Sequence, residues 1–284
     1  GIFFLCFSMT VSPLMCKIFI ATQPSEHNHL EKTTFHFAFF VVKWALVYGY
    51  RKDGRQMTAF QELFSDFYKC FIKEDRYKLL VSGIGVTVKV SLLAVFIGIL
   101  IGLLIAMCNL SKRKPLKFIG SLYTDVIRGT PSVTQLMIIY FVIFATVDLD
   151  KWIIAAIAFG INSGAYVSEI IRAGIMSVDH GQTEAGRSLG LNAFQTMTRI
   201  VIPQAVKNIF PALCNEFIVL IKETAIVGYV GLMDIQKAGD FIKSATFLAF
   251  MPLIGTAVIY YVLIKILTLL LHRIEMMLRK SDIR

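Results

Sequence analysis

The sequence has few charged residues. Asp, Glu, Lys and Arg make up 17% of its 284 residues, against about 25% in a typical soluble domain. The hydrophobic fraction is 56%, and several apolar runs reach the roughly 20 residues that a helix needs to cross a bilayer. Together these features predict an all-α integral membrane protein.

The spacings of cysteine and histidine that metal sites use are also missing. The five cysteines form no CxxC pair, and the five histidines form no H-x-x-x-H pair on a predicted helix. No cluster of His, Asp or Ser on facing helices indicates a membrane-embedded enzyme. We therefore predict no metal site, no cofactor bound by this chain and no catalytic residues.

Acidic residues are scarcer than basic ones, which gives a formal net charge of +10. Much of the basic excess lies beside apolar runs, at residues 111–117 (SKRKPLK) and 273–284 (RIEMMLRKSDIR). Positive charge next to membrane spans marks the cytoplasmic side. We therefore interpret the charge as a signal of membrane orientation and predict no binding of nucleic acid.

Apolar runs predict five membrane spans. They cover about residues 81–107, 118–146, 152–173, 204–222 and 246–271. With the basic segments inside, the N-terminus lies outside and the C-terminus in the cytoplasm. Gly98 and Gly102 in the first span, and Gly160 and Gly164 in the third, are pairs that let helices approach closely.

The second span contains a charged stretch that ends in proline: Arg128, Gly129, Thr130 and Pro131. Proline has no N–H, so it should break or kink the span, and the freed carbonyl groups must find partners inside the protein. We expect these four residues to have an architectural role rather than to contact substrate.

Residues 181–190, GQTEAGRSLG, come close to a nucleotide-binding P-loop, but essential parts are missing. Arg187 stands where the P-loop has lysine, and no β-α-β pattern surrounds the stretch. Glu184 would also place a carboxylate where phosphates should sit. The stretch therefore does not predict ATP binding by this chain.

The same stretch belongs to a longer pattern at about residues 178–203. Six residues carry it: Glu184, Ala185, Gly186, Gly190, Ile200 and Pro203. They resemble the EAA loop of importer-type ABC transporter permeases, E-A-A-x-x-x-G, nine residues, I-x-L-P. Gly186 replaces the third alanine, and Ile202 replaces the leucine.

Cap-like pairs flank this pattern. Asp179 with Gln182, and Asn192 with Gln195, could each start a short helix, and Gly190 could supply the left-handed residue that ends the first. The resemblance implies a coupling helix that docks into a groove of a separate ATPase subunit. The alternative is an ordinary amphipathic loop, with its apolar residues packing on the membrane face: Phe194, Met197 and Val201.

The resemblance extends from about residue 58 to the end of the sequence. Five further segments are similar to permeases of the polar amino acid ABC importer family: residues 127–131, 135–141, 162–175, 215–226 and 273–275. Membership implies a five-transmembrane-helix core of a type I ABC importer permease, with a cytoplasmic coupling helix, in the bacterial plasma membrane.

The resemblance also implies partners. Two ABC ATPase subunits would bind ATP and magnesium, an extracytoplasmic binding protein would deliver the amino acid, and a second permease would complete a homodimer or a heterodimer. This chain would be a transport subunit, not an enzyme, embedded in membrane lipid.

Residues 1–56 differ from the rest and begin with glycine. They could hold a signal peptide, an extra span, or read-through of an upstream frame before a true start at Met57. We favour the third interpretation, because family members commonly open with a short amphipathic segment. Residues 57–80 are therefore expected to form an amphipathic interfacial helix, and 81–284 the permease transmembrane domain.

Polar residues inside spans are candidates for the substrate path. On the third span Asn162, Tyr166 and Glu169 share one helical face, beside the Gly160–Gly164 groove that a path at a dimer interface would use. On the fourth span the candidates are Asn215, Glu216 and Lys222. In the alternative interpretation, Glu169 pairs with Arg172 and Lys222 with a nearby carboxylate as structural bridges.

The function predicted is therefore that of a transmembrane permease subunit of an ATP-driven importer of polar amino acids. The alternative is an ATP-independent carrier or channel. Such proteins often contain internal repeats of spans, and we find no convincing repeat.

Overall fold

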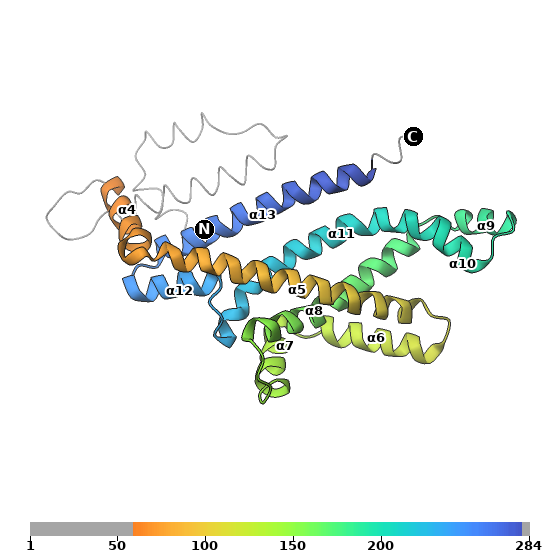
Figure 1. Ribbon diagram of the computed structural model, residues 1–284, viewed down its shortest axis with the longest axis horizontal. Helices are drawn as coiled ribbons and strands as arrows, with labels where there is room; N and C mark the ends of the chain where they lie inside the picture. The colour runs from red at the N-terminus through yellow and green to blue at the C-terminus, as the bar shows by residue number, and fades with distance from the viewer. Residues whose placement is uncertain (1–58, 280–284) are drawn as a thin grey trace, which may run out of the picture. The chain divides into compact units, whose positions relative to one another are not determined.

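The computed structural model of the protein describes residues 59–279. The chain divides into two units, residues 1–65 and 66–284, and the account below concerns the second. The interpretations of residues 1–56, including the start at Met57, lie outside the described residues. Within residues 59–279 the structure contains helices and no strand (Figure 1).

The described part of the chain consists of α-helices joined by short turns and by segments of other helix types. The α-helices are α4 (Ala59–Phe67), α5 (Tyr77–Leu110), α6 (Lys114–Arg128), α7 (Ser132–Ile138), α8 (Lys151–Met176), α9 (His180–Ser188), α10 (Ala193–Thr196), α11 (Ile202–Glu223), α12 (Ile235–Thr246) and α13 (Phe250–Arg279). Short π- and 3₁₀-helical segments continue several of them: Tyr68–Ile72, Lys73–Asp75, Ile139–Ile143, Met197–Val201 and Thr224–Val230.

The stretch 57–80, expected to be one interfacial helix, contains a break. Glu74 and Asp75 have positive φ angles of 59° and 53°, a left-handed conformation that an α-helix cannot continue through. The long helix α5 therefore starts at Tyr77, slightly before the predicted first span.

Three helices, α5, α8 and α13, are long and apolar enough to cross a membrane, or four spans if α6 and the helical stretch 132–143 count as one bent span. The fourth predicted span corresponds to α11, which has 22 residues but is not among the helices that are apolar enough to cross a membrane. The count of five therefore stays a prediction. Only 6% of the apolar part of α13 is buried, as expected of a helix that faces lipid.

Helices α5 and α8 make the most extensive contact in the structure. A Cβ atom on Gly102 would lie 2.5 Å from Val167 Cγ1, and one on Gly160 only 2.6 Å from Ile97 Cγ2. The predicted close approach is confirmed. The groove at Gly160 and Gly164 is filled by Ile97 and Ile101 of α5 in the same chain, and a substrate path at a dimer interface beside it stays a prediction.

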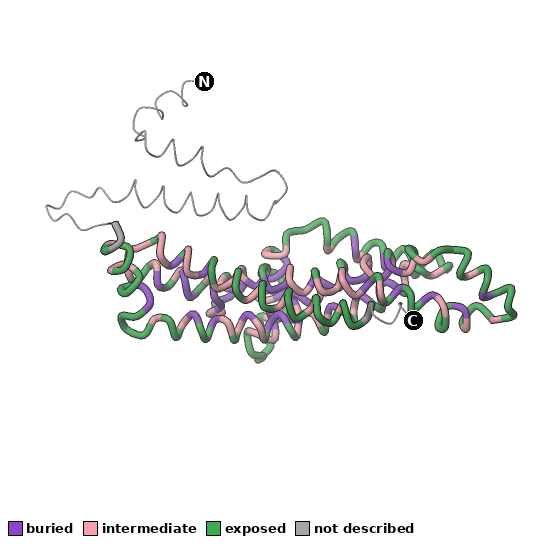
Figure 2. The backbone as a smooth tube through the Cα atoms, turned by 90° about the horizontal axis from the view of Figure 1, so that it is seen from above, coloured by how far each residue is buried: buried purple, intermediate pink, exposed green. Residues whose placement is uncertain are grey.

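Buried residues lie where helices face one another, and exposed ones lie along their outer sides (Figure 2). One apolar cluster joins α5, α7, α8 and α11 through residues such as Val90, Leu136, Phe159 and Leu220. The chain therefore positions α8 at the centre, in contact with α5, α6, α7 and α11.

The predicted break at Pro131 is confirmed. Helix α6 ends at Arg128, α7 begins at Ser132, and the two axes meet at an angle of 103°. We call this bend, residues 126–135, the elbow.

Candidate functional site

The loop between α8 and α11, residues 177–201, contains the EAA-like pattern. In Figure 1, α9 and α10 lie beyond the ends of α8 and α11, at the right of the view. Asp179 Oδ1 accepts a 2.7 Å hydrogen bond from Gly181 N and caps α9. Gly190 has a φ of +83°, so the left-handed turn predicted after the first helix is confirmed.

The second cap is complete. Asn192 Oδ1 accepts from Gln195 N at 2.8 Å, while Gln195 Oε1 accepts from Asn192 N at 3.0 Å. This reciprocal capping box starts α10 as predicted. At the first cap the Gln182 side chain does not close such a box; it lies 3.3 Å from Gln204 Nε2 at the start of α11.

Gly186 lies where α9 packs against the helical segment that follows it. It is buried, and a Cβ atom would lie 2.8 Å from Ile200 Cδ1 and 2.9 Å from Thr196 Cγ2. Glycine in place of the third alanine therefore lets α9 pack closely on the following helical segment. Pro203 stands in the first turn of α11, where a helix needs no N–H donor.

The outer surface of the loop combines charge with apolar side chains. Glu184 is exposed, and its Oε1 lies 3.3 Å from His180 Nδ1. Leu189 and Phe194 are 82% and 76% exposed. Of the three residues that the amphipathic alternative placed on a packing face, Val201 is buried, whereas Phe194 and Met197 are exposed.

The candidates on α8 face the elbow and α6. Asn162 is buried, and its Nδ2 donates to Gln135 Oε1 on α7 at 2.9 Å. The guanidinium of Arg128 lies 5.3 Å from the centre of the Tyr166 ring. The structural bridge weighed for Glu169 is present, since Arg172 Nη2 donates to Glu169 Oε2 at 2.8 Å.

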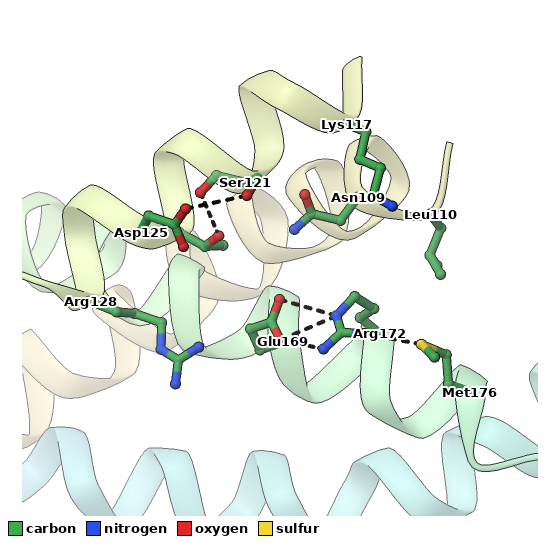
Figure 3. A pocket seen from close by; sticks show the side chains of 10 residues that line it. Asn109, Leu110, Lys117, Ser121, Asp125, Arg128, Glu169, Arg172 and Met176 are labelled. Carbon is green, nitrogen blue, oxygen red and sulfur yellow. Dashed lines mark hydrogen bonds and ion pairs between the residues drawn. The ribbon is translucent and has the colours of Figure 1, made fainter. Parts of the chain in front are cut away.

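A cleft of about 400 Å³ opens between the end of α5, helix α6 and the end of α8 (Figure 3). Its lining residues are Asn109, Leu110, Lys117, Ser121, Thr124, Asp125, Arg128, Glu169, Arg172 and Met176. Cationic and anionic groups both line it, an arrangement that suits a zwitterionic ligand.

Sequence reasoning missed most of this cleft. Ser121 and Asp125 lie on α6, inside the predicted second span, where they were not singled out as polar candidates. The charged pair Asp125 and Arg128, three residues apart within an apolar run, was the available signal.

The candidates on α11 lie elsewhere. Glu216 is buried and accepts a 2.8 Å hydrogen bond from Ser163 Oγ on α8, whereas Asn215 and Lys222 are exposed. None of the three lines the cleft. The structure therefore brings Tyr166 and Glu169 together with Arg128 but does not join the α11 candidates to them.

Three carbonyl groups at the end of α6, including that of Ile127 opposite Pro131, accept hydrogen bonds within the elbow. Gly129 N donates to Asp125 O at 2.9 Å, and Thr130 Oγ1 donates to Val126 O at 2.9 Å. Gln135 Nε2 donates to Ile127 O at 2.7 Å. The prediction that these carbonyls find partners inside the protein is confirmed; the residue that meets the last of them, Gln135, was not foreseen.

Comparison with known proteins identifies the family to which this chain is similar. Residues 98–280 match the family described as binding-protein-dependent transport system inner membrane component. The chain is 43% identical over 198 residues to the putative glutamine transport system permease protein GlnP of Rickettsia bellii, covering 69% of this chain and 91% of that protein. It is 41% identical over 205 residues to the arginine transport system permease protein ArtQ of Bacillus subtilis, covering 72% and 94%.

Solved structures of ABC transporters have a similar fold. A crystal structure of an amino acid ABC transporter with histidines superposes with a TM-score of 0.67 at 45% identity, covering 72% of this chain and 97% of that chain. An inward-facing MetNI methionine ABC transporter shares the fold, with a TM-score of 0.63 at 19% identity. The chain belongs to the binding-protein-dependent inner membrane component family and is the permease subunit of an amino acid ABC importer, whose ATPase is a separate subunit.

Proposed function

We propose that this permease imports polar amino acids and couples to its ATPase partners through the loop 177–201. The observation that carries the proposal is the exposed surface of this loop, where Leu189 follows α9 and Phe194 lies on α10, two helices whose N-termini are capped by side chains. Apolar side chains on a short, well-ordered pair of helices are suited to insertion into a groove of another protein. The six residues of the EAA-like pattern then shape and present this surface: Glu184, Ala185, Gly186, Gly190, Ile200 and Pro203.

The relatives support the substrate class. The named permeases are described as transporting glutamine, arginine and cystine, all of which have polar side chains. We propose that the substrate crosses along the cleft beside α6 and α8, where Tyr166 and Glu169 stand close to Arg128. Asn162, bonded to Gln135, would position the elbow instead of contacting substrate. Asn215, Glu216 and Lys222 of α11 lie outside the cleft and would not contact substrate there.

The remaining parts of the system follow from this assignment. ATP and magnesium would bind to the ATPase subunits, a second permease would complete the membrane core, and a binding protein would deliver the amino acid. The basic segments 111–117 and 273–284 support an orientation in the bacterial plasma membrane with the loop 177–201 and the C-terminus in the cytoplasm and the N-terminus outside.

Copurification tests the docking surface. We expect Leu189→Glu and Phe194→Glu to lose the ATPase partner when the complex is solubilised in detergent, because a charge in an apolar groove is costly to desolvate. The matched control is Phe247→Glu, a phenylalanine that is 94% exposed in the turn between α12 and α13. ATPase recovery that is equal in all three variants and the wild type would reject the docking surface.

A further inference from the structure

The elbow between α6 and α7 depends on one side chain, that of Gln135. In a continuous helix the N–H of residue 131 would bond to Ile127 O, but Pro131 has no N–H. Gln135 Nε2 takes its place and donates to Ile127 O at 2.7 Å. A side-chain amide therefore completes the backbone bonding of α6 at its broken end.

The same nitrogen also contacts Thr130. Gln135 Nε2 lies 2.6 Å from Thr130 Oγ1 and 3.2 Å from Thr130 O. Thr130 Oγ1 in turn donates to Val126 O. The amide thus reaches across the bend to both the last turn of α6 and the residue before Pro131, which fixes the angle between the two helices.

The other end of the amide faces α8. Gln135 Oε1 accepts a 2.9 Å hydrogen bond from Asn162 Nδ2, and both side chains are buried. The orientation of the Gln135 amide is therefore determined: its nitrogen must point to the elbow carbonyls and its oxygen to Asn162. We call this arrangement of Gln135, Asn162, Ile127 and Thr130 the clasp.

Two further contacts attach the same region to α8. Tyr123 Oη on α6 donates to Ile161 O at 2.6 Å, one residue before Asn162. Arg128, at the end of α6, stacks on Tyr166 one helical turn beyond it. The elbow is thus bonded to the middle of α8, the helix whose end leads directly into the loop 177–201.

We propose that Gln135 is a positioning residue for transport: the clasp makes the elbow move with α8, so that a displacement of α8 at the loop also moves the Arg128 end of the cleft. The direction of this transmission rests on the proposed docking role of the loop. The hydrogen bonds of the clasp do not depend on that role, because they join only α6, α7 and α8. A broken clasp leaves the ATPase subunits bound and active but weakens the attachment of the elbow to α8, which then depends on the Tyr123 and Arg128 contacts alone.

The test compares amino acid uptake with ATP hydrolysis in proteoliposomes that contain the whole transporter and its binding protein. The variants are Gln135→Leu, Gln135→Glu, Asn162→Leu and the double variant Gln135→Leu/Asn162→Leu. Gln135→Glu keeps the size of the side chain and its acceptor for Asn162, but the carboxylate cannot donate to Ile127 O. The matched control is Gln236→Leu, because the Gln236 side chain makes no hydrogen bond within residues 59–279.

We expect each Gln135 variant to reduce uptake at least tenfold while ATP hydrolysis stays within twofold of the wild type, and the control to keep both. Amino acid uptake by the double variant should be no lower than that of the more impaired single variant, because both substitutions break the same clasp. The ATPase partner should still copurify with Gln135→Leu, which separates a broken clasp from a failure of the docking loop.

Four results would overturn the proposal. The first is uptake within twofold of the wild type in Gln135→Leu. The second is a parallel fall of uptake and hydrolysis in Gln135→Glu, and the third is a failure of both Gln135 variant proteins to accumulate in the membrane; either indicates a merely structural residue. The fourth is a double variant whose loss equals the product of the two single losses.

Discussion

Ser163 Oγ on α8 donates a 2.8 Å hydrogen bond to Glu216 Oε1 on α11, and both side chains are buried. These two helices lead into and out of the loop 177–201. A second bond joins them nearer the loop, where Asn208 Nδ2 donates to Ser177 Oγ at 2.9 Å. The loop is therefore held by two helices that are bonded to each other, and it can transmit a force to both.

We expect Ser163→Ala to destabilise the protein by about 1–3 kcal/mol, because it leaves a buried carboxylate without its hydrogen-bond donor. The midpoint of thermal unfolding in detergent measures the effect. Ser82→Ala serves as control, since Ser82 is exposed and bonds only to Leu79 O in its own helix; it should change stability by less than about 0.5 kcal/mol. Equal midpoints for the two variants would show that the Ser163–Glu216 bond contributes nothing.

Gly190→Val should abolish uptake and leave membrane insertion intact. No atom lies within 4 Å of a Cβ at this position, so the penalty comes from the φ of +83° alone. Such a conformation costs about 1–3 kcal/mol for a residue that does not favour it. Asparagine tolerates left-handed backbone, so Gly190→Asn should keep most of the uptake, and a valine variant as active as the asparagine variant contradicts the role of this turn.

Gly102→Leu should separate α5 from α8. The new side chain would collide with Val167 and with Gly164 O, and overpacking of this kind costs about 1–3 kcal/mol. Gly85→Leu is the control on the same helix, because nothing lies within 4 Å of a Cβ at Gly85. The amount of folded protein recovered in detergent should fall for Gly102→Leu only, and equal recovery of both variants contradicts this packing.

Glu169→Gln should raise the amino acid concentration needed for half-maximal uptake by at least about tenfold, because a contact with a charged group contributes about 1.5–3 kcal/mol. Its control is Asp240→Asn, which breaks a similar i,i+3 pair, with Lys243, outside the cleft. Uptake measured over a range of concentrations separates the two. A lower maximal rate with an unchanged half-saturating concentration would assign Glu169 to structure alone.

Local features of this fold were predictable from the sequence. The capping box of Asn192 and Gln195, the left-handed Gly190 and the break at Pro131 each depend on residues a few positions apart. Short-range geometry of this kind is set by the backbone and by one or two side chains, so residue types at fixed spacing are sufficient to identify it.

Long-range pairings were not predictable. Gln135 and Asn162 are 27 positions apart, and Ser163 and Glu216 are 53 apart; which partner each finds depends on how helices rotate and pack. The Gly160–Gly164 groove was recognised as a packing surface, but the sequence could not show that α5 fills it. The family pattern, by contrast, correctly favoured an ATP-driven importer over the ATP-independent carrier, and family membership bears this out.

The most direct test of the account is amino acid uptake into proteoliposomes containing this permease, its ATPase partner and the binding protein, with ATP on the side of the loop 177–201. We predict accumulation against a gradient that requires ATP and is lost in Gly186→Leu, whose side chain would collide with Ile200 and Thr196 and push α9 away. Accumulation that continues without ATP, or that is unchanged in Gly186→Leu, would contradict the account.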